Sequence, residues 1–340
     1  MRIYRYNIGM NKAHSDEYDY INFLIAAQKS YSCLEAGKVQ PDEVGSPSHD
    51  SLTRLLHREV PSTSKLWKEA KSQVKRTTGL LILDDTTLDK PYAKKMELVK
   101  RQWSGKHHQT VLGINLLTLL WSDGDRHIPC DYRIYDKVND GLGKNEHFRM
   151  LLDVANQRGL MPECVCFDSW YSSLENLKHI RGHHWHWFTR LKPNRLVNAD
   201  GNGNVAIARV EIGCEGRIVH LKYYGFIKVF KTVSTNGDVE YWATSNLNMT
   251  VIGRLSTSEK VWTIENYHRG LKQFCGVEKC QCRSATAQRN HIGCSIRAFL
   301  RLEVYSFASG HSWFEAKSQI IRHATRAYLQ NPLYILHSTA

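Results

Sequence analysis

Residues 79–87 have the sequence GLLILDDTT, and the fold prediction starts from this stretch. Four apolar residues, 80–83, follow a glycine and precede a polar turn that ends in Pro91, which predicts a short strand buried on both faces. Asp84 and Asp85 come at its C-terminal end. A carboxylate at the edge of a core is costly unless a cation or hydrogen-bond donors meet it. The pair therefore either caps a strand-to-turn junction or contributes a ligand to a site that later acids complete.

The composition indicates a globular intracellular protein. With 340 residues, 42% of them apolar, the chain is long enough for two or three domains. No run of about 18 apolar residues occurs and the N-terminus lacks the apolar segment of a secretory signal, so neither a membrane span nor export is expected. The nine cysteines lack regular spacing and are predicted to be reduced thiols. A zinc site at Cys275, Cys280 and Cys282, completed by His291 and Cys294, is the less favoured alternative.

The net charge of +13 favours a polyanionic partner, and nucleic acid is the usual one for a basic intracellular chain. The alternative is a basic surface that binds no polyanionic partner. The charge is concentrated directly after the acidic strand end. The segment between Thr86 and Thr110 contains two acidic residues, Asp89 and Glu97, and six basic ones: Lys90, Lys94, Lys95, Lys100, Arg101 and Lys106.

Changes in composition and periodicity divide the chain into five segments. Residues 1–78 are predicted to form an all-helical N-terminal module for DNA binding or an accessory role, although its leucine stripes are equally typical of core helices. Residues 79–192 form the first part of an α/β core. Residues 193–250 alternate apolar and polar residues and are predicted to be a β-rich insertion. Helices return in 251–310, which complete the core, and 311–340 form a helical C-terminal tail.

Seven elements are expected within the first part of the core, in the order strand, strand, strand, helix, strand, helix, strand: residues 79–87, 107–124, 126–136, 145–159, 164–168, 172–183 and 185–192. The first three strands predict an antiparallel meander. The whole order is that of the ribonuclease-H-like fold, a mixed sheet with helices on both faces. Ligand sites in such sheets lie at the carboxyl ends of central strands, where Asp85 and Asp168 both fall.

A third acid lies in the helix predicted after the insertion, within the sequence VWTIENYHRGLKQF of residues 261–274. Helical spacing places Glu265, Arg269 and Lys272 on one face. The alternative to a functional site is that these residues form a charged, solvent-exposed face of the helix. Together with the two aspartates at strand ends in a basic chain, Glu265 predicts a site for two Mg²⁺ ions. Hard divalent cations prefer oxygen ligands, and their remaining coordination positions are taken by water and phosphate oxygens.

These motifs resemble those of the DDE transposases of bacterial insertion sequences, in the group whose third motif reads Tyr-x2-Arg-x3-Glu-x6-Lys. The resemblance runs from about Leu80 to Tyr305. The first motif, Asp-Thr-Thr after a buried strand, matches residues 85–87 and selects Asp85 over Asp84. The second matches residues 165–169. The third matches Trp262, Ile264, Glu265, His268, Arg269 and Lys272, but departs from the motif at Ser258 and Val261, where Tyr and Arg are expected.

The resemblance implies a transposase that cleaves DNA at the ends of its element and joins these ends to target DNA. Asp85, Asp168 and Glu265 are then the catalytic residues and the ligands of two Mg²⁺ ions, for which Mn²⁺ can substitute. The expected partners are double-stranded DNA, as terminal inverted repeats and target, and at least one further copy of the chain. The expected location is the cytoplasm, at the nucleoid. The alternatives are a non-catalytic DNA-binding or regulatory protein derived from a transposase, and a ribonuclease-H-like nuclease without a role in transposition.

The resemblance and the charge pattern together assign DNA contacts to Lys272, Arg269, His268, Lys260, Trp242, Lys94, Lys95, Arg101 and Lys106. The insertion of the related group carries an aromatic residue that holds a flipped base, and Trp242 is the candidate by position, with a strand-core tryptophan as the alternative. Lys260 or Arg254 is expected to replace the missing motif residues. Phosphate contacts are also expected from Arg283, Arg289, Arg297 and Arg301.

Overall fold

A mixed β-sheet forms the centre of the protein. The computed structural model describes residues 15–41, 43–105 and 107–332. The core strands are β1 (Leu80–Asp89), β2 (Lys100–Ser104), β3 (Gln109–Ser122), β4 (Ile128–Ile134), β5 (Cys164–Phe167) and β6 (Trp187–Leu191). β4, β3 and β1 are antiparallel neighbours, and β1, β5 and β6 run parallel. This is the strand order of the ribonuclease-H-like fold, so the predicted fold class is confirmed; only the short edge strand β2 was not expected.

Helices cover both faces of this core. α6 (Lys144–Gln157) packs on one face, where Phe148 contacts Phe167 of β5 and stacks on Tyr171. The short helix α5 (Lys137–Asp140) precedes it, and α7 (Leu174–Gly182) follows the 3₁₀ turn Ser169–Tyr171. α9 (Thr263–Phe274) packs on the opposite face through Tyr267, next to Thr118 of β3.

The insertion continues the core sheet. Its strands are β7 (Leu196–Asn198), β8 (Val205–Ala206), β9 (Arg217–Leu221), β10 (Gly225–Val233) and β11 (Val239–Thr244), with a 3₁₀ turn at Ile207–Arg209. β11 pairs antiparallel with β6, so the described strands form one eleven-stranded sheet. The β-rich character of this segment was expected from the sequence, but the pairing with β6 was not, because strand alternation does not specify the partner.

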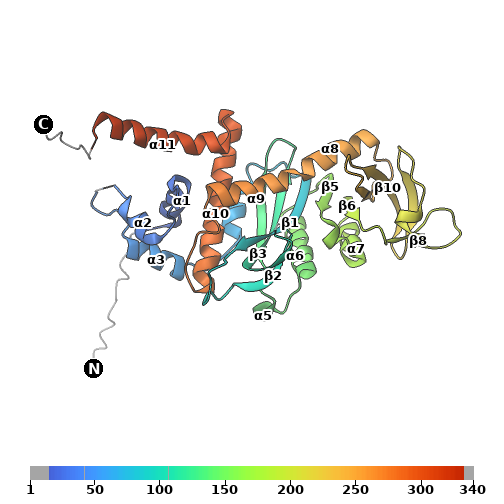
Figure 1. The fold of residues 1–340 in the computed structure, drawn as a ribbon, viewed down its shortest axis with the longest axis horizontal. Helices are drawn as coiled ribbons and strands as arrows, with labels where there is room; N and C mark the ends of the chain where they lie inside the picture. Colours follow the sequence, from blue (N-terminus) through green and yellow to red (C-terminus); the bar gives the residue numbers. More distant parts are fainter. Residues whose placement is uncertain (1–14, 42, 106, 333–340) are drawn as a thin grey trace, which may run out of the picture.

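The helices after the insertion lead back to the core. α8 (Val251–Val261) begins after Thr250, whose hydroxyl accepts a hydrogen bond from the Gly253 amide and caps the helix. α8 and α9 then run across the sheet towards α10 (Ala285–Ser309), and α11 (Trp313–Gln330) extends away from it (Figure 1). Within the described residues no helix is long and apolar enough to cross a membrane.

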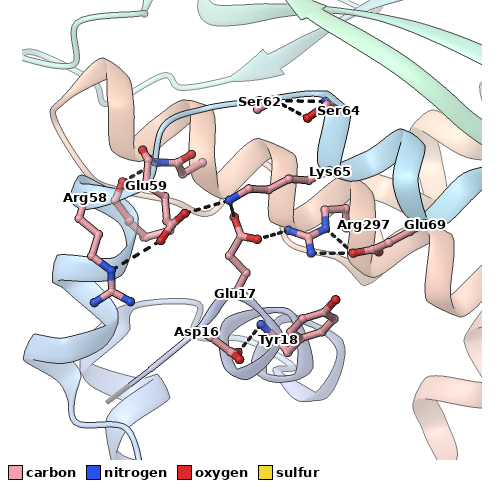
Figure 2. A network of polar contacts seen from close by, with 12 residues as sticks. Asp16, Glu17, Tyr18, Arg58, Glu59, Ser62, Ser64, Lys65, Glu69 and Arg297 are labelled. Carbon is pink, nitrogen blue, oxygen red and sulfur yellow. Dashed lines mark hydrogen bonds and ion pairs between the residues drawn. The ribbon is translucent and has the colours of Figure 1, made fainter. Parts of the chain in front are cut away.

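Three of the N-terminal helices pack against α10, whereas α2 (Cys33–Lys38) packs on the helix that follows it. The three are α1 (Glu17–Ala26), α3 (His49–Arg58) and α4 (Ser64–Ala70). Figure 2 shows the polar network that joins them: Arg297 of α10 binds Glu17 at 2.7 Å and Glu69 at 2.6 Å, and Lys65 also binds Glu17. Arg297 is only 5% exposed, so the phosphate contact expected for it is wrong. Whether residues 1–78 form a separate unit stays a prediction.

The network predicts an acid-sensitive contribution to stability. Burial alone raises the pKa of Glu17, but hydrogen bonds from Lys65 and Arg297 outweigh burial and hold the pKa below its ordinary value of 4.5. A carboxylate with a depressed pKa stabilises the fold above its unfolded-state pKa, and this stabilisation is lost as the pH falls through the folded-state value. Glu17→Gln is therefore expected to destabilise the protein at pH 7 and to approach the wild type in stability as the pH falls below 4.5. Urea unfolding of both proteins over pH 3–7 measures this; a constant difference would contradict it.

Candidate active site

Asp84 and Asp168 project from the same face of the sheet. β1 and β5 pair in parallel, with Leu83 in register with Phe167. The next residue on each chain is an aspartate, and residues in register on neighbouring strands point to the same face. Asp85, one position further along β1, points to the opposite face. β1 continues to Asp89, so the two carboxylates lie in the middle of the strand, not at its expected end, and point to different sides of the sheet.

A cavity of about 650 Å³ opens on the Asp84 face. Its lining includes Asp84, Asp168 and Glu265, which come from β1, from the end of β5 and from α9. Residues of α8 and of the β10–β11 hairpin complete the lining. The structure thus brings together two of the three predicted ligands, Asp168 and Glu265, with Asp84 in place of Asp85.

Glu265 reaches the cavity from a broken helix. The sequence predicted one helix over 261–274, but α8 ends at Val261 and α9 begins at Thr263, with Trp262 capping both. Glu265 lies in the first turn of α9, where the helix dipole favours a negative charge. Ser258 and Val261, the two departures from the family motif, line the same cavity.

Asp85 has its own partners on the other face. It accepts hydrogen bonds from Asn115 Nδ2 at 2.6 Å, from Lys144 Nζ at 2.8 Å and from the Tyr171 hydroxyl. Burial alone raises the pKa of Asp85, but the Lys144 ammonium and these hydrogen bonds outweigh burial and lower it below its ordinary value. The choice of Asp85 over Asp84 from the Asp-Thr-Thr motif therefore differs from this geometry. The motif does not specify which of two adjacent strand residues faces the later acids.

Two cavity residues, Arg190 and Glu240, were not expected from the sequence. Arg190 of β6 lies 3.2 Å from Asp168 Oδ1 and 2.7 Å from Glu240 Oε1. Glu240 also accepts a hydrogen bond from Trp242 Nε1 at 3.0 Å, and the Trp242 ring stacks on Phe188 with centroids 4.9 Å apart. The only sequence signal was an arginine within an apolar strand. Its position beside Asp168 depends on strand register, which the sequence does not show.

The three carboxylates have the donor chemistry that a divalent cation needs, but their oxygen atoms do not all lie within 4.8 Å of one another, so binding one ion through all three requires side-chain rotation. Burial raises the pKa of Asp84 well above its ordinary value, and the negative charges of Asp85, Glu265 and Asp168 raise it further. A cation among Asp84, Asp168 and Glu265 would relieve this repulsion. The donor set contains carboxylate oxygens and no thiol or imidazole, which is the set that Mg²⁺ and Mn²⁺ prefer.

Two of the residues predicted to contact DNA have structural partners instead. His268 is 5% exposed, and burial lowers its pKa to about 3, so it is a neutral side chain packed beside Tyr267. The structure does not place it where DNA can reach, because it lies on the apolar face of α9. Lys272 Nζ donates to the Thr87 carbonyl at 2.7 Å and lies 3.2 Å from Glu278, so it ties α9 to the end of β1.

The other basic candidates lie mostly on the surface. Those exposed to solvent are Lys94, Lys95, Arg101 and Arg269. Lys94 and Lys95 also line a second cavity, together with Lys279 and Arg283. This cavity joins the basic loop after β1 to the segment after α9. Lys106 lies outside the described residues.

Arg254 is the cation of α8 that faces the active-site cavity. It is 8% exposed and lines the cavity, and its guanidinium makes no hydrogen bond or ion pair with the described part of the chain. Burial lowers the pKa of Arg254, and the negative charge of Glu240 partly opposes this. Lys260, the other residue expected to replace the missing motif side chains, does not line the cavity; its side chain lies beside Gly124.

The sheet has the ribonuclease-H-like strand order, and carboxylates from two of its central strands and from a following helix line one cavity. The comparison with protein families is more particular: the model of the transposase DDE domain matches residues 75–300. The match covers more than half of the chain, so this protein belongs to the DDE transposase family, whose members are enzymes of DNA transposition.

A solved structure supports the fold. The cryo-EM structure of the piggyBac transposase synaptic complex with hairpin DNA matches with a TM-score of 0.52, over 96% of this chain and 74% of that chain, at 12% sequence identity. A search of curated protein sequences gave no significant match.

Proposed function

We propose that this transposase cleaves DNA at the ends of its own element and joins the freed 3′-ends to target DNA, with Asp84, Asp168 and Glu265 as its metal ligands. The observation that carries the proposal is the convergence of these three carboxylates in one cavity of a DDE-family chain. Nothing in the structure or the comparisons favours the non-catalytic regulator or the nuclease without transposition.

The reaction needs charge stabilisation more than covalent chemistry, because phosphoryl transfer depends on positioning and electrostatics. Bound Mg²⁺ or Mn²⁺, two ions in the proposed arrangement, supplies activation of the attacking hydroxyl and stabilisation of the leaving 3′-oxygen. Asp84 holds its carboxylate within β1, Asp168 directly follows β5, and Glu265 approaches from α9. Arg190 fixes the Asp168 carboxylate from β6.

Asp85 acts in this proposal as a positioning residue. Its hydrogen bond with Tyr171 ties β1 to the turn that directly follows Asp168. Its ion pair with Lys144 ties the same strand end to α6. Asp85 therefore orients the segments that carry Asp84 and Asp168 without facing the cavity.

DNA is expected to approach over the exposed basic residues of the surface. The exposed Lys94, Lys95 and Arg101 supply positive charge after β1, and Arg269 supplies it on α9. Contacts with phosphates would make binding weaken as salt rises. Trp242, at the cavity wall, stays the candidate for holding an unpaired base. Two element ends must be brought together for joining, so the active complex is proposed to contain at least two copies of the chain, in the bacterial cytoplasm at the nucleoid.

The test is a donor DNA fragment that carries the sequences flanking the coding region, incubated with the full chain and a target plasmid. We expect cleavage at both ends and joined products with Mg²⁺ or Mn²⁺, and neither with EDTA. Cleavage without joining would identify a nuclease. End binding without cleavage under every metal condition would identify the regulatory alternative.

Arg254 is predicted to hold a phosphate of the cleaved end. Removing a charge-assisted hydrogen bond costs about 1.5–3 kcal/mol, so Arg254→Gln is expected to weaken cleavage by about 10- to 100-fold. Arg254→Lys should recover part of this loss because it retains the charge. Lys260→Gln is the matched comparison on the same helix and should have little effect. Equal losses in Arg254→Gln and Lys260→Gln would contradict the assignment.

A further inference from the structure

A group of two histidines and one aspartate lies outside the active-site cavity, on the helices α6 and α7. His179 Nε2 is 2.8 Å from Asp153 Oδ1, and His183 Nε2 is 3.0 Å from the same oxygen. The two imidazole rings are perpendicular, with centroids 4.9 Å apart. Among the described residues, this is the one group of three or more His, Cys, Asp or Glu side chains whose ligand atoms all lie within 4.8 Å of one another.

The chain builds this convergence from local geometry. His179 lies in the last turn of α7 and His183 caps its C-terminus, so their spacing of four residues puts both rings on one side of the helix. Asp153 faces them from α6, which packs beside α7. The His183 ring also packs against Trp185, with centroids 4.9 Å apart, which restricts its orientation.

The arrangement is close to a three-ligand metal site. Zinc binds imidazole nitrogen and carboxylate oxygen at about 2.0–2.2 Å, which separates tetrahedral ligand atoms by roughly 3.3 Å. The two nitrogen-to-oxygen separations, 2.8 and 3.0 Å, are a few tenths of an ångström shorter, a difference that small side-chain rotations remove, and the two imidazole nitrogens lie within 4.8 Å of each other. The side chains are 26%, 16% and 41% exposed for His179, His183 and Asp153, so an ion can enter from solvent and keep a water ligand.

Hydrogen bonds alone are the competing explanation. Each imidazole can donate its Nε2–H to the shared oxygen, and such a pair needs no metal. In the hydrogen-bonded arrangement both Nε2 atoms carry a proton and donate it to one oxygen. In a metal site both Nε2 atoms would be unprotonated and would bind the ion through their lone pairs. The two explanations therefore differ in what happens when a transition metal is supplied.

We propose that Asp153, His179 and His183 bind one Zn²⁺ ion that fastens α6 to α7. Imidazole ligands distinguish this site from the all-carboxylate site in the cavity, which suits Mg²⁺ or Mn²⁺. Fastening α6 to α7 would also restrict the segment around Asp168, because α6 packs against the residues next to it. Phe148 of α6 contacts Phe167 and Tyr171, the residues on either side of the Asp168 segment. The ion is structural: it stiffens the support of the active site and takes no part in the chemistry.

The experiment uses the full chain freed of metal with EDTA and dialysed against Zn²⁺ at equal free concentrations. Zinc content and thermal unfolding are compared for the wild type, His179→Gln, His183→Gln and a control, His323→Gln, which changes an exposed histidine of α11. We expect the wild type and the control to bind one equivalent more than either ligand variant, whose affinity falls at least about a hundredfold. Zinc should raise the Tm of the wild type and not that of the variants.

Cobalt provides an independent readout. Co²⁺ in a site of low coordination number absorbs more strongly in the visible range than hydrated Co²⁺, and this signal is expected for the wild type and the control only. Unchanged Tm values of the metal-free variants exclude misfolding as the cause. Equal zinc content, Tm shift and cobalt spectrum in the wild type and in His183→Gln would overturn the proposal and leave a hydrogen-bonded cluster.

Discussion

Asp84→Asn, Asp168→Asn and Glu265→Gln are each expected to lower the rate of DNA cleavage by about a thousandfold or more. Each change removes a charged group from the proposed metal site, where cations would contribute several kcal/mol of transition-state stabilisation, and every 1.36 kcal/mol corresponds to a factor of ten. The three side chains line one cavity, so their effects should be similar and far from additive. Cleavage of a labelled donor fragment, with binding of the same fragment measured in parallel, gives both quantities.

Binding of the DNA end should change little in these variants, because the phosphate contacts come from other residues. Glu175→Gln is the matched control: it neutralises an exposed glutamate of α7, 72% exposed, outside the cavity. It should cleave at the wild-type rate. Retention of full cleavage in Asp168→Asn or Glu265→Gln would contradict the assigned site.

Arg297→Met is expected to destabilise the protein by about 3 kcal/mol or more. The change removes the positive charge that binds Glu17 and Glu69 but keeps most of the apolar stem. Breaking a buried ion pair is costly, and here the change leaves Glu17 with Lys65 alone and Glu69 with Arg301 alone. The partners reinforce the guanidinium charge: burial would lower the pKa of Arg297, but hydrogen bonds with Glu69 and Glu17 raise it above its ordinary value.

Arg301→Met is the comparison for this prediction. Arg301 binds the same Glu69 at 2.9 Å but is 27% exposed, and exposed ion pairs contribute about 0–1 kcal/mol. Denaturant unfolding of both variants gives the change in the free energy of unfolding for each one. The comparison requires that the m value, the slope of this free energy against denaturant concentration, stays the same. Equal changes in both would show that the buried network does not hold the N-terminal helices to α10.

Much of the fold was predictable because the decisive patterns are local. The buried run Leu80–Leu83 and the change from strand to helix periodicity after residue 136 fix the order of the core elements, and this order matches the structure. The continuation of the sheet from β6 into β11 was not predictable, because pairing between distant strands leaves no local signal. The break at Trp262 was also missed, since residues 261–274 have uninterrupted helical periodicity.

The sequence predicted which types of residue form the candidate site, but not every position that contributes to it. Asp168 and Glu265 follow from their places at a strand end and on a helix, and the cavity contains both. The choice between Asp84 and Asp85 depends on which face of β1 meets α9, and adjacent residues of the same type give no sequence signal for this. His268 matched a family motif, yet its place on the apolar face of α9 buries it. Arg190 and Arg254 approach the cavity only through tertiary packing.

The central claim is that Asp84, together with Asp168 and Glu265, forms the catalytic carboxylate set, while Asp85 supports it from the other face. The most direct measurement compares the single-turnover cleavage rates of Asp84→Asn and Asp85→Asn at saturating Mg²⁺ and Mn²⁺, with Tm as a check on folding. The structure predicts no detectable cleavage by Asp84→Asn at any metal concentration and measurable, reduced cleavage by Asp85→Asn. Cleavage by Asp84→Asn together with an inactive, folded Asp85→Asn would contradict the claim.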